Sequence, residues 1–211
     1  MTTFLKGIKK PFLVTVAMLL ICGLAYPLLL TGISQLIFPH QANGSLIALG
    51  EQIVGSELVG QDFSDARFMK SRPSAVNYNT YSQEEKESGK YTGVGSGSKN
   101  YAPTNPELIQ RVEADIADFL EANPSVKKAD IPTDLLTASG SGLDPHISPE
   151  AAAVQIPALA ETTGLSQETL EVIVMENTQG KFLGIFGERT VNVLMVNLSI
   201  AKELGLLEQA E

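Results

Sequence analysis

Apolar residues dominate one uninterrupted stretch near the start of the chain. The segment from Pro11 to Pro39, PFLVTVAMLLICGLAYPLLLTGISQLIFP, contains no Asp, Glu, Lys or Arg. Roughly 20 apolar residues cross a hydrocarbon core of about 30 Å, so a run of this length spans a membrane with some tilt. The pattern predicts a single transmembrane helix over residues 11–39.

Basic residues flank this run on one side only. Three lysines precede it, Lys6, Lys9 and Lys10. No further Lys or Arg occurs until Arg67. Because short segments rich in Lys and Arg stay in the cytoplasm, we expect residues 1–10 to be cytoplasmic and residues 40–211 to be extracytoplasmic.

A cleaved secretory signal is the alternative interpretation of a basic start followed by an apolar run. The apolar part of a signal has about 7–15 residues and ends at a site of small residues. This run is about twice that length, and Ser34-Gln35-Leu36 and Ile37-Phe38-Pro39 fit such a site poorly. Cys22 does not match a lipoprotein cysteine, since Ile21 precedes it where a small residue is expected. We therefore favour an uncleaved anchor.

Small and hydroxyl-bearing residues form a stripe along the predicted helix. Gly23, Pro27, Thr31 and Ser34 follow one another at helical spacing. Such residues allow helix backbones to approach closely, and a proline is tolerated in a membrane helix when neighbouring helices pack against it. The stripe favours packing against partner helices, while contact with lipid alone remains the alternative.

Beyond residue 40 the pattern predicts short elements of both kinds. Apolar residues divided by glycines predict small strands or a hairpin over residues 41–60. Capping residues followed by apolar residues at helical spacing predict three helices, which begin after Asn105, Ser148 and Ser166. Runs of β-prone residues predict further strands within 63–76, 131–139, 182–186 and 191–198, and a helix ends the chain. The fold class expected is a single N-terminal transmembrane helix plus a mixed α/β extracytoplasmic domain.

Residues 77–106 are polar and rich in glycine, which predicts a long polar loop. The segment Gly93–Lys99, GVGSGSK, resembles a phosphate-binding loop only superficially. That motif requires Gly at 98 and Ser or Thr at 100, where this chain has Ser98 and Asn100.

Charge and metal-ligating residues limit the possible functions. All 24 acidic residues and 12 of the 15 basic residues follow the apolar run, so the predicted exterior is strongly acidic. This balance argues against nucleic acid or an anionic membrane surface as partners. The only histidines are His40 and His146, and no cluster has the ligand spacing of a zinc site.

Serines among glycines at residues 139–142 raise the possibility of a nucleophile. The segment TASGSG is not the G-x-S-x-G motif, and the only candidate base nearby is His146. We instead interpret Ser139, Gly140, Ser141, Gly142, Leu143 and Asp144 as a tight turn that leads into the helix after Ser148. The sequence predicts no catalytic, cofactor-binding or metal-binding residue in this chain.

Longer segments resemble one family specifically. They are LLTASGSGLDPHISPEAAAVQIPALA (Leu135–Ala160), FLGIFGERTVNVLMVNLSIAKEL (Phe182–Leu204), VGSELVGQDF (Val54–Phe63), Arg72-Pro73-Ser74 and Asn105-Pro106-Glu107-Leu108. In this order, and with one N-terminal span before them, they resemble the C subunit of the Kdp potassium-pumping P-type ATPase. The residues 139–144 belong to the signature of that family.

The resemblance implies an accessory, non-catalytic subunit in a bacterial plasma membrane. In that family a channel-like A subunit carries K⁺, a B subunit hydrolyses ATP, and a small single-span subunit accompanies them. The C subunit is described as supporting assembly and as a catalytic chaperone that raises the ATP affinity of the B subunit, so ATP and K⁺ are handled by the complex. Without the resemblance, the alternative is a membrane-anchored extracytoplasmic binding or sensor domain, and an exterior hydrolase lacks a catalytic constellation.

Overall fold

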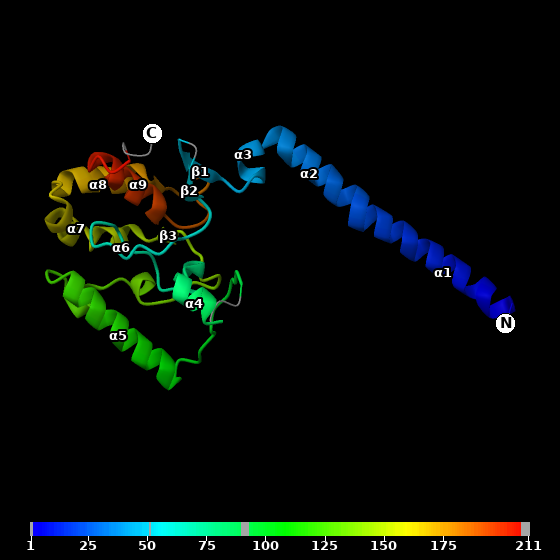
Figure 1. The fold of residues 1–211 in the computed structure, drawn as a ribbon, viewed down its shortest axis with the longest axis horizontal. Coiled ribbons are helices and arrows are strands. Elements are labelled where there is room, and N and C mark those ends of the chain that lie inside the picture. Colours follow the sequence, from blue (N-terminus) through cyan, green and yellow to red (C-terminus); the bar gives the residue numbers. More distant parts are fainter. Residues whose placement is uncertain (1, 51, 90–92, 208–211) are drawn as a thin grey trace. The chain divides into compact units, whose positions relative to one another are not determined.

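The computed structural model describes residues 2–50, 52–89 and 93–207. The chain divides into two units, Met1–Leu46 and Ile47–Glu211. The first unit is a long helix followed by one short helix, and the second is a mixed α/β domain. Figure 1 labels the elements of both units.

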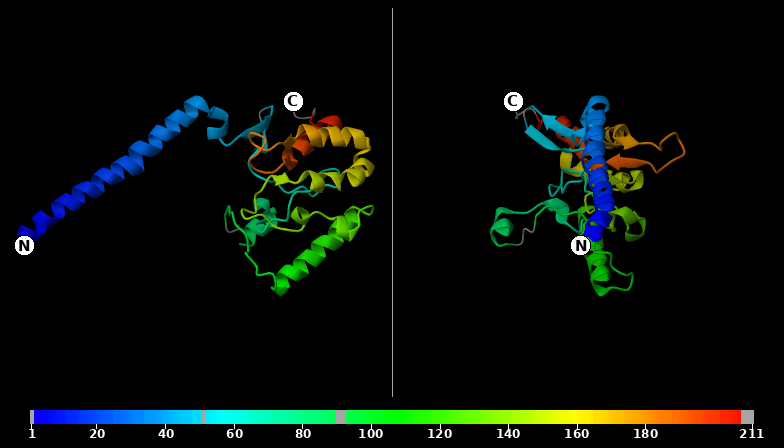
Figure 2. Two further views of the ribbon diagram at one scale, coloured as in Figure 1. Left: turned by 180° about the vertical axis from the view of Figure 1, so that it is seen from behind. Right: turned by 90° about the vertical axis from the view of Figure 1, so that its right-hand side faces the viewer.

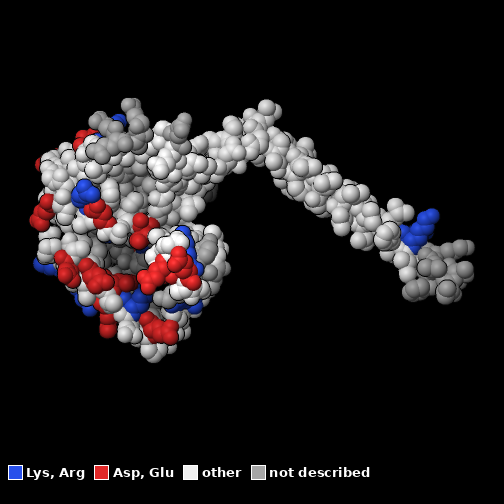
Figure 3. Space-filling view, viewed as in Figure 1, with Lys and Arg blue, Asp and Glu red and all other residues white. Residues whose placement is uncertain are grey.

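The first unit confirms the predicted apolar helix. Helix α1 (Thr2–Leu20) continues through a π-helical turn (Ile21–Ala25) into α2 (Tyr26–Ile37), and α3 (Pro39–Ala42) follows. Over Gly7–Ile37 this helix is long and apolar enough to cross a membrane. In Figure 3 it is white along its described length except for basic residues near its N-terminal end.

The π-helical turn accommodates Pro27 inside the long helix. Pro27 has no N–H to donate to the carbonyl of Gly23, as a regular α-helix would require. The chain widens before it, so that the backbone N–H of Tyr26 bonds the carbonyl of Ile21, five residues earlier. Such turns are single features of otherwise regular helices and occur frequently at functional sites.

The second unit is mainly helical. Its α-helices are α4 (Gln83–Glu87), α5 (Pro106–Ala122), α6 (Pro149–Ala153), α7 (Ile156–Thr163), α8 (Gln167–Glu176) and α9 (Val193–Glu203). Helices α8 and α9 lie along one edge of this domain, α6 and α7 lie next to them, and α5 lies along the opposite edge (Figure 1). The space between these edges holds much of the irregular chain.

Two small sheets complete the domain, and the three-stranded one is antiparallel. Strands β1 (Leu46–Leu49) and β2 (Gln52–Ser56) form a two-stranded sheet at its start, which confirms the predicted hairpin. Strands β3 (His146–Ile147), β4 (Thr178–Gln179) and β5 (Thr190–Asn192) form the other, in the order β3-β5-β4. His146 pairs with Asn192, and Thr178 pairs with Val191.

The three predicted helix starts are confirmed by their caps. The side chains of Asn105, Ser148 and Ser166 each accept a hydrogen bond from a backbone N–H in the first turn of α5, α6 and α8. The second predicted helix is in fact two, because the chain breaks between α6 and α7. Pro157 lies in the first turn of α7, where a missing N–H is harmless, and therefore does not kink a helix.

Three predicted strands are wrong, and a fourth is right only at its start. Residues 63–76 contain no strand, residues 131–139 contain only a 3₁₀ turn (Thr133–Leu135), and residues 182–186 contain only an isolated bridge between Phe182 and Phe186. Of the run 191–198, only Val191 and Asn192 are in β5, and helix α9 begins at Val193. Asn192 caps this helix by accepting from the backbone N–H of Met195. Helix α9 is buried on most sides, so tertiary packing overrides the β propensity of its valines.

The segment predicted as a long polar loop also contains regular structure. Within residues 77–106, a 3₁₀ turn (Asn77–Asn79) and the short helix α4 are present. Ser82 and Glu85 form a capping box that begins α4.

One hydrophobic core holds the second unit together. Its largest fully buried side chains are Met69, Leu170, Val191, Val193, Val196 and Ile200. Side chains of α5, among them Ile116 and Phe119, pack against it from the partly buried rim. Most of this core therefore comes from α6–α9 and the strands between them.

Met69 lies in this core on a segment that belongs to no sheet. Side-chain amides form the hydrogen bonds to its backbone that a neighbouring strand would otherwise form. Asn197, on α9, accepts from the Met69 backbone N–H at 2.8 Å and donates to the Met69 carbonyl at 2.9 Å. Gln155 does the same for Lys70, at 2.8 and 3.3 Å. Both amides are buried, and Asn197 is only 2% exposed.

Replacing Asn197 with Ala tests this amide pairing. The variant leaves the buried N–H and C=O of Met69 without partners, which we expect to lower the free energy of unfolding by about 2–4 kcal/mol. Thermal unfolding of the full chain in detergent, followed by circular dichroism, measures the change. Glu203→Ala, an exposed change on the same helix, should unfold like the parent; equal melting of N197A and E203A would contradict the assigned role.

Candidate functional site

The Ser139–Asp144 segment forms the tight turn that the sequence predicts. The Ser139 hydroxyl accepts from the backbone N–H of Gly142 at 2.9 Å, and the Ser141 hydroxyl accepts from that of Leu143 at 3.1 Å. Gly142 has φ = +67°, in the left-handed region that favours glycine. Both serine hydroxyls are therefore committed to the shape of the turn.

Three other segments bind the carbonyl groups of this turn. The backbone N–H of Gly60 donates to the Leu143 carbonyl at 2.8 Å, and that of Gly97 donates to the Ser141 carbonyl at 2.7 Å. The Ser74 hydroxyl donates to the Gly142 carbonyl at 2.6 Å. Segments far apart in the sequence thus meet at residues 139–144, which makes the turn a junction of the domain.

Close backbone approach explains why glycine occupies two positions of this junction. A Cβ atom at Gly142 would lie 2.8 Å from the Gly97 carbonyl oxygen and 2.8 Å from a methyl carbon of Val76. A Cβ atom at Gly60 would lie 2.5 Å from the Asp144 carbonyl oxygen. Gly140, in the same turn, has open space around the corresponding position.

Asp144 connects the turn to two cationic or potentially cationic groups. One carboxylate oxygen accepts from Arg72 Nη1 at 2.9 Å, and the other accepts from the backbone N–H of His146 at 3.0 Å and lies 3.6 Å from its Nδ1. Burial raises the pKa of Asp144, but the hydrogen bonds from His146 and Arg72 outweigh it, so the pKa lies below its usual value. Arg72 also donates through Nε to the Thr137 carbonyl at 3.3 Å, which fixes its plane.

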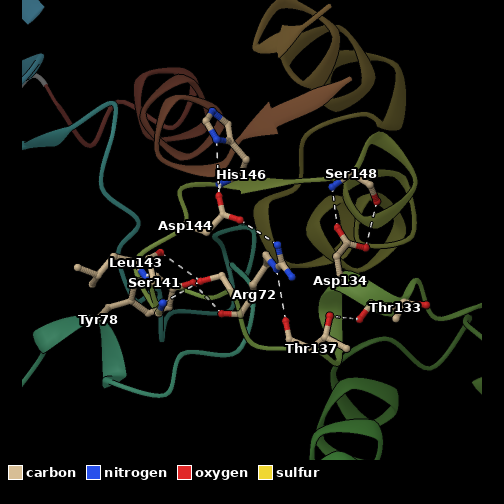
Figure 4. Close-up of polar contacts among 12 residues, drawn as sticks. Arg72, Tyr78, Thr133, Asp134, Thr137, Ser141, Leu143, Asp144, His146 and Ser148 are labelled. Carbon is tan, nitrogen blue, oxygen red and sulfur yellow. Dashed lines mark hydrogen bonds and ion pairs between the residues drawn. The ribbon is translucent and has the colours of Figure 1, made fainter. Parts of the chain in front are cut away.

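A second carboxylate orders the exit from the turn. Asp134 accepts from the backbone N–H of Ser148 at 2.7 Å and from its hydroxyl at 3.1 Å (Figure 4). The Ser148 hydroxyl in turn accepts from Ala151 N–H in the first turn of α6. The sequence pattern indicated the cap at Ser148 but gave no sign of Asp134, because the two residues come from separate turns.

The arrangement around His146 does not form a nucleophile and base. Among the described residues no hydrogen bond joins His146 to Ser139 or Ser141, and Nδ1 faces Asp144 instead. Its buried Nε2 has no hydrogen-bond partner in the part of the chain that the structure describes. The geometry supports a structural role for both serines.

The glycine-rich segment near Gly97 does not present its amides to a phosphate group. The Gly97 N–H bonds the Ser141 carbonyl, and the Gly95 N–H bonds the Asn79 side chain at 2.8 Å. The Ser96 hydroxyl donates to the Ser141 carbonyl at 3.1 Å. A phosphate loop needs such groups free to face its ligand, so the motif comparison and the geometry agree.

A cavity of about 310 Å³ opens beside the junction. Its wall includes Ser74, Lys99, Tyr101, Arg111 and Thr137. Arg111 pairs with Asp115 and donates to the Leu136 carbonyl at 3.0 Å, so its charge is already compensated. In residues 2–50, 52–89 and 93–207 no group of three or more His, Cys, Asp and Glu side chains is placed to hold a metal ion.

The predicted stripe lies in the first unit and is not part of this junction. Gly23 is inside the π-helical turn, and Pro27, Thr31 and Ser34 follow in α2. Gly23, Pro27 and Thr31 are exposed, and Ser34 is partly covered. These four residues therefore have surface that lipid or another helix can cover.

Sequence reasoning missed the partners of the turn rather than the turn itself. Gly60, Arg72 and Ser74 stand out in the sequence only within segments that resemble a family. Gly97 stands out only within the segment compared with a phosphate-binding loop. The only sequence features that mark these partners are local ones, namely glycines among polar residues and an arginine before a proline. Their convergence depends on long-range folding, which no local pattern contains.

Comparison with known proteins gives a consistent result. A family model described as "KdpC: K+-transporting ATPase, c chain" matches residues 8–202. A protein of Clostridium kluyveri named "Potassium-transporting ATPase KdpC subunit" is 73% identical over 99% of this chain and 100% of its own length. Proteins of the same name from Clostridioides difficile and Caldanaerobacter subterraneus are 55% and 45% identical, over 96% and 94% of this chain and 100% and 96% of their own lengths.

Replacing Gly142 with Ala tests the junction, and Gly140→Ala is its matched control. The G142A change forces a side chain into positive φ and against Gly97, which we expect to cost about 1–3 kcal/mol of unfolding free energy. The G140A change meets open space and should leave stability within about 0.5 kcal/mol. Thermal unfolding of both full-length variants in detergent measures the difference in stability. If G142A is as stable as G140A, the turn does not depend on close packing.

Proposed function

Because this chain belongs to the KdpC family, we propose that it is an accessory, non-catalytic subunit of an ATP-driven K⁺-import complex. The observation that carries the proposal is the match to the family of the ATPase c chain over residues 8–202, together with relatives aligned over nearly their whole lengths. The serines that resembled a nucleophile bond backbone amides, which supports a role without chemistry of its own.

The partners that we propose are the remaining subunits of the complex. A channel-like subunit would carry K⁺, an ATP-hydrolysing subunit would supply energy, and a small single-span subunit would complete the assembly. K⁺ and ATP would then be handled by those partners. The present chain would support their assembly and stability.

The orientation that we propose follows from charge asymmetry. The three lysines before the apolar helix and the absence of Lys and Arg from 11 to 66 favour a cytoplasmic N-terminus and an extracytoplasmic domain. A domain on that side cannot touch cytoplasmic nucleotide. Any chaperone effect on ATP affinity would therefore act through the membrane helix or through neighbouring subunits.

The membrane helix supplies a surface suited to a partner helix. The stripe Gly23, Pro27, Thr31 and Ser34 lets backbones approach, and the π-helical turn at Ile21–Ala25 changes the local width of the helix. Close packing and hydrogen bonds hold membrane helices together, since lipid tails offer no hydrophobic driving force between them. This is why a surface of small residues supports the accessory role better than a surface of leucines would.

Purification of the tagged chain from native membranes in mild detergent tests the function. We expect a multispan subunit and a P-type ATPase to co-purify, and K⁺-stimulated ATP hydrolysis to fall when this chain is stripped from the complex and to return when it is added back. A chain that purifies alone and stable would contradict the accessory role and support a membrane-anchored binding or sensor domain.

Gly23→Leu tests the helix contact, with Ala25→Leu as its control on the other side of the helix. The G23L change places a large side chain in the stripe, and we expect loss of about 1 kcal/mol of helix association, a roughly fivefold fall in co-purified partner. Quantitative blotting of the purified complex measures it. Equal recovery with G23L and A25L would show that the stripe faces only lipid.

A further inference from the structure

An arm of the domain ends in a cluster of exposed apolar side chains. Strands β4 and β5 pair antiparallel, and the residues between them project away from the rest of the domain, as the right-hand view of Figure 2 shows. We call Phe182–Gly187 the hairpin tip. Phe182 and Phe186 form a bridge across it, and Lys181 pairs with Glu188 at 3.3 Å just below.

The side chains of the hairpin tip are among the most exposed apolar groups in the domain. Phe182, Leu183, Ile185 and Phe186 are 71%, 75%, 75% and 62% exposed. No charged residue interrupts them, and none of the four belongs to the hydrophobic core or packs against it. Single exposed apolar residues are ordinary, but a contiguous apolar cluster marks a surface that contacts a membrane or another protein.

Four backbone N–H groups of the hairpin tip form hydrogen bonds within the arm. Phe182 and Phe186 exchange hydrogen bonds at 2.8 and 3.0 Å. The N–H groups of Gly184 and Ile185 donate to carbonyls within the same turn, at 3.0 and 3.2 Å. Because an unpaired backbone group is costly in an apolar medium, this internal pairing lowers the penalty for inserting the tip.

The backbone of the hairpin tip adopts an unfavourable conformation at Leu183. Leu183 has φ = +53°, a region that residues other than glycine seldom adopt, and Gly184 follows at +75°. The arm thus maintains a costly conformation in which Leu183 is three-quarters exposed.

The connection between the apolar helix and the start of the domain is short. Eight residues separate Ile37, at the end of α2, from Leu46 in β1, so the domain begins no more than about 30 Å along the chain from the apolar helix. The Asn192 side chain donates to the Glu57 carbonyl at 2.8 Å, which joins the base of the arm to the end of β2. The arm therefore leaves the domain beside the strands through which the chain enters it.

Charge at the base of the arm also suits a lipid surface. Lys181 lies on one side of the hairpin tip, and Glu188 and Arg189 lie on the other. Because Lys181 pairs with Glu188, the three residues together carry one net positive charge, which favours phosphate headgroups if the tip is inserted. The rest of the domain is strongly acidic, which disfavours a broad approach to anionic lipid. Contact limited to a narrow apolar arm, whose base carries one net positive charge, keeps the acidic remainder of the domain away from the lipid surface.

We propose that the hairpin tip inserts into the interface of the membrane that holds the N-terminal helix, giving the domain a second point of attachment. The proposal rests on the spanning role of Gly7–Ile37 but does not require partner subunits. A groove on a partner subunit is the other possible occupant. The bilayer is favoured because the chain itself carries an apolar helix fit to cross it, a few residues from the domain.

Tryptophan fluorescence tests the proposal without background, since the chain has no Trp. The Ile185→Trp variant of the full chain is reconstituted into phosphatidylcholine vesicles with and without phosphatidylglycerol. We expect its emission to move to shorter wavelength and to be quenched by lipids brominated on the acyl chain. Met175→Trp, at a 64% exposed apolar position on α8, should remain open to iodide in the water phase.

A further pair of changes separates insertion by the arm from attraction of the new Trp to lipid. Adding Leu183→Ser and Phe186→Ser to the I185W variant should return its emission and iodide quenching to those of the Met175→Trp control. If I185W alone is as accessible to iodide as that control, the proposal is wrong. It is also wrong if protection appears only when partner subunits are added and brominated lipid does not quench.

The outcome is independent of the proposed function. The vesicle experiment uses this chain alone, so a negative result leaves membership of the complex unchanged. Failure of partners to co-purify would likewise leave the membrane contact of the hairpin tip intact.

Discussion

Hydrogen bonds from side chains to irregular backbone are the constraint on which the soluble domain depends. Residues 60–76 cross the domain without joining a sheet, although Met69 is fully buried. Buried peptide groups need partners, and here Asn197 and Gln155 supply them as a strand neighbour would. The hydrophobic core can close only because those two amides let an irregular segment enter it.

The same solution recurs at the Ser139–Asp144 junction. Carbonyl groups of the turn accept from Gly60, Ser74 and Gly97, and Asp144 accepts from Arg72. These contacts join the entry of the domain, the irregular segment and the polar stretch after residue 77 to one short turn. Tyr78 adds a further contact by donating its hydroxyl to the Arg72 carbonyl at 2.7 Å, and burial raises its pKa to about 12. These contacts give residues 139–144 a role in holding the fold together.

Local sequence signals predicted what is local in this structure. The apolar run, the caps at Asn105, Ser148 and Ser166 and the hairpin over residues 41–60 depend on nearest neighbours, and each was recovered. The β-prone run from Val191 failed because a helix buried on most sides accepts β-branched residues that an exposed one would not. The partners of the turn were missed because their pairing joins segments up to about 80 residues apart, and only the folded chain brings them together.

A second membrane contact would change what the anchor can do. A single helix fixes the chain in the bilayer but leaves a domain on a short connection free to rotate about it. Each large apolar side chain removed from water contributes roughly 1.5–3 kcal/mol, and the ordering of the arm and the strain at Leu183 reduce that gain. Because the helix already keeps the domain near the surface, even a weak residual affinity acts at high effective concentration. Two points of attachment restrict how the domain can rotate relative to the membrane. A tip that binds weakly by itself would therefore be sufficient to orient the junction and the acidic surface toward a neighbouring subunit.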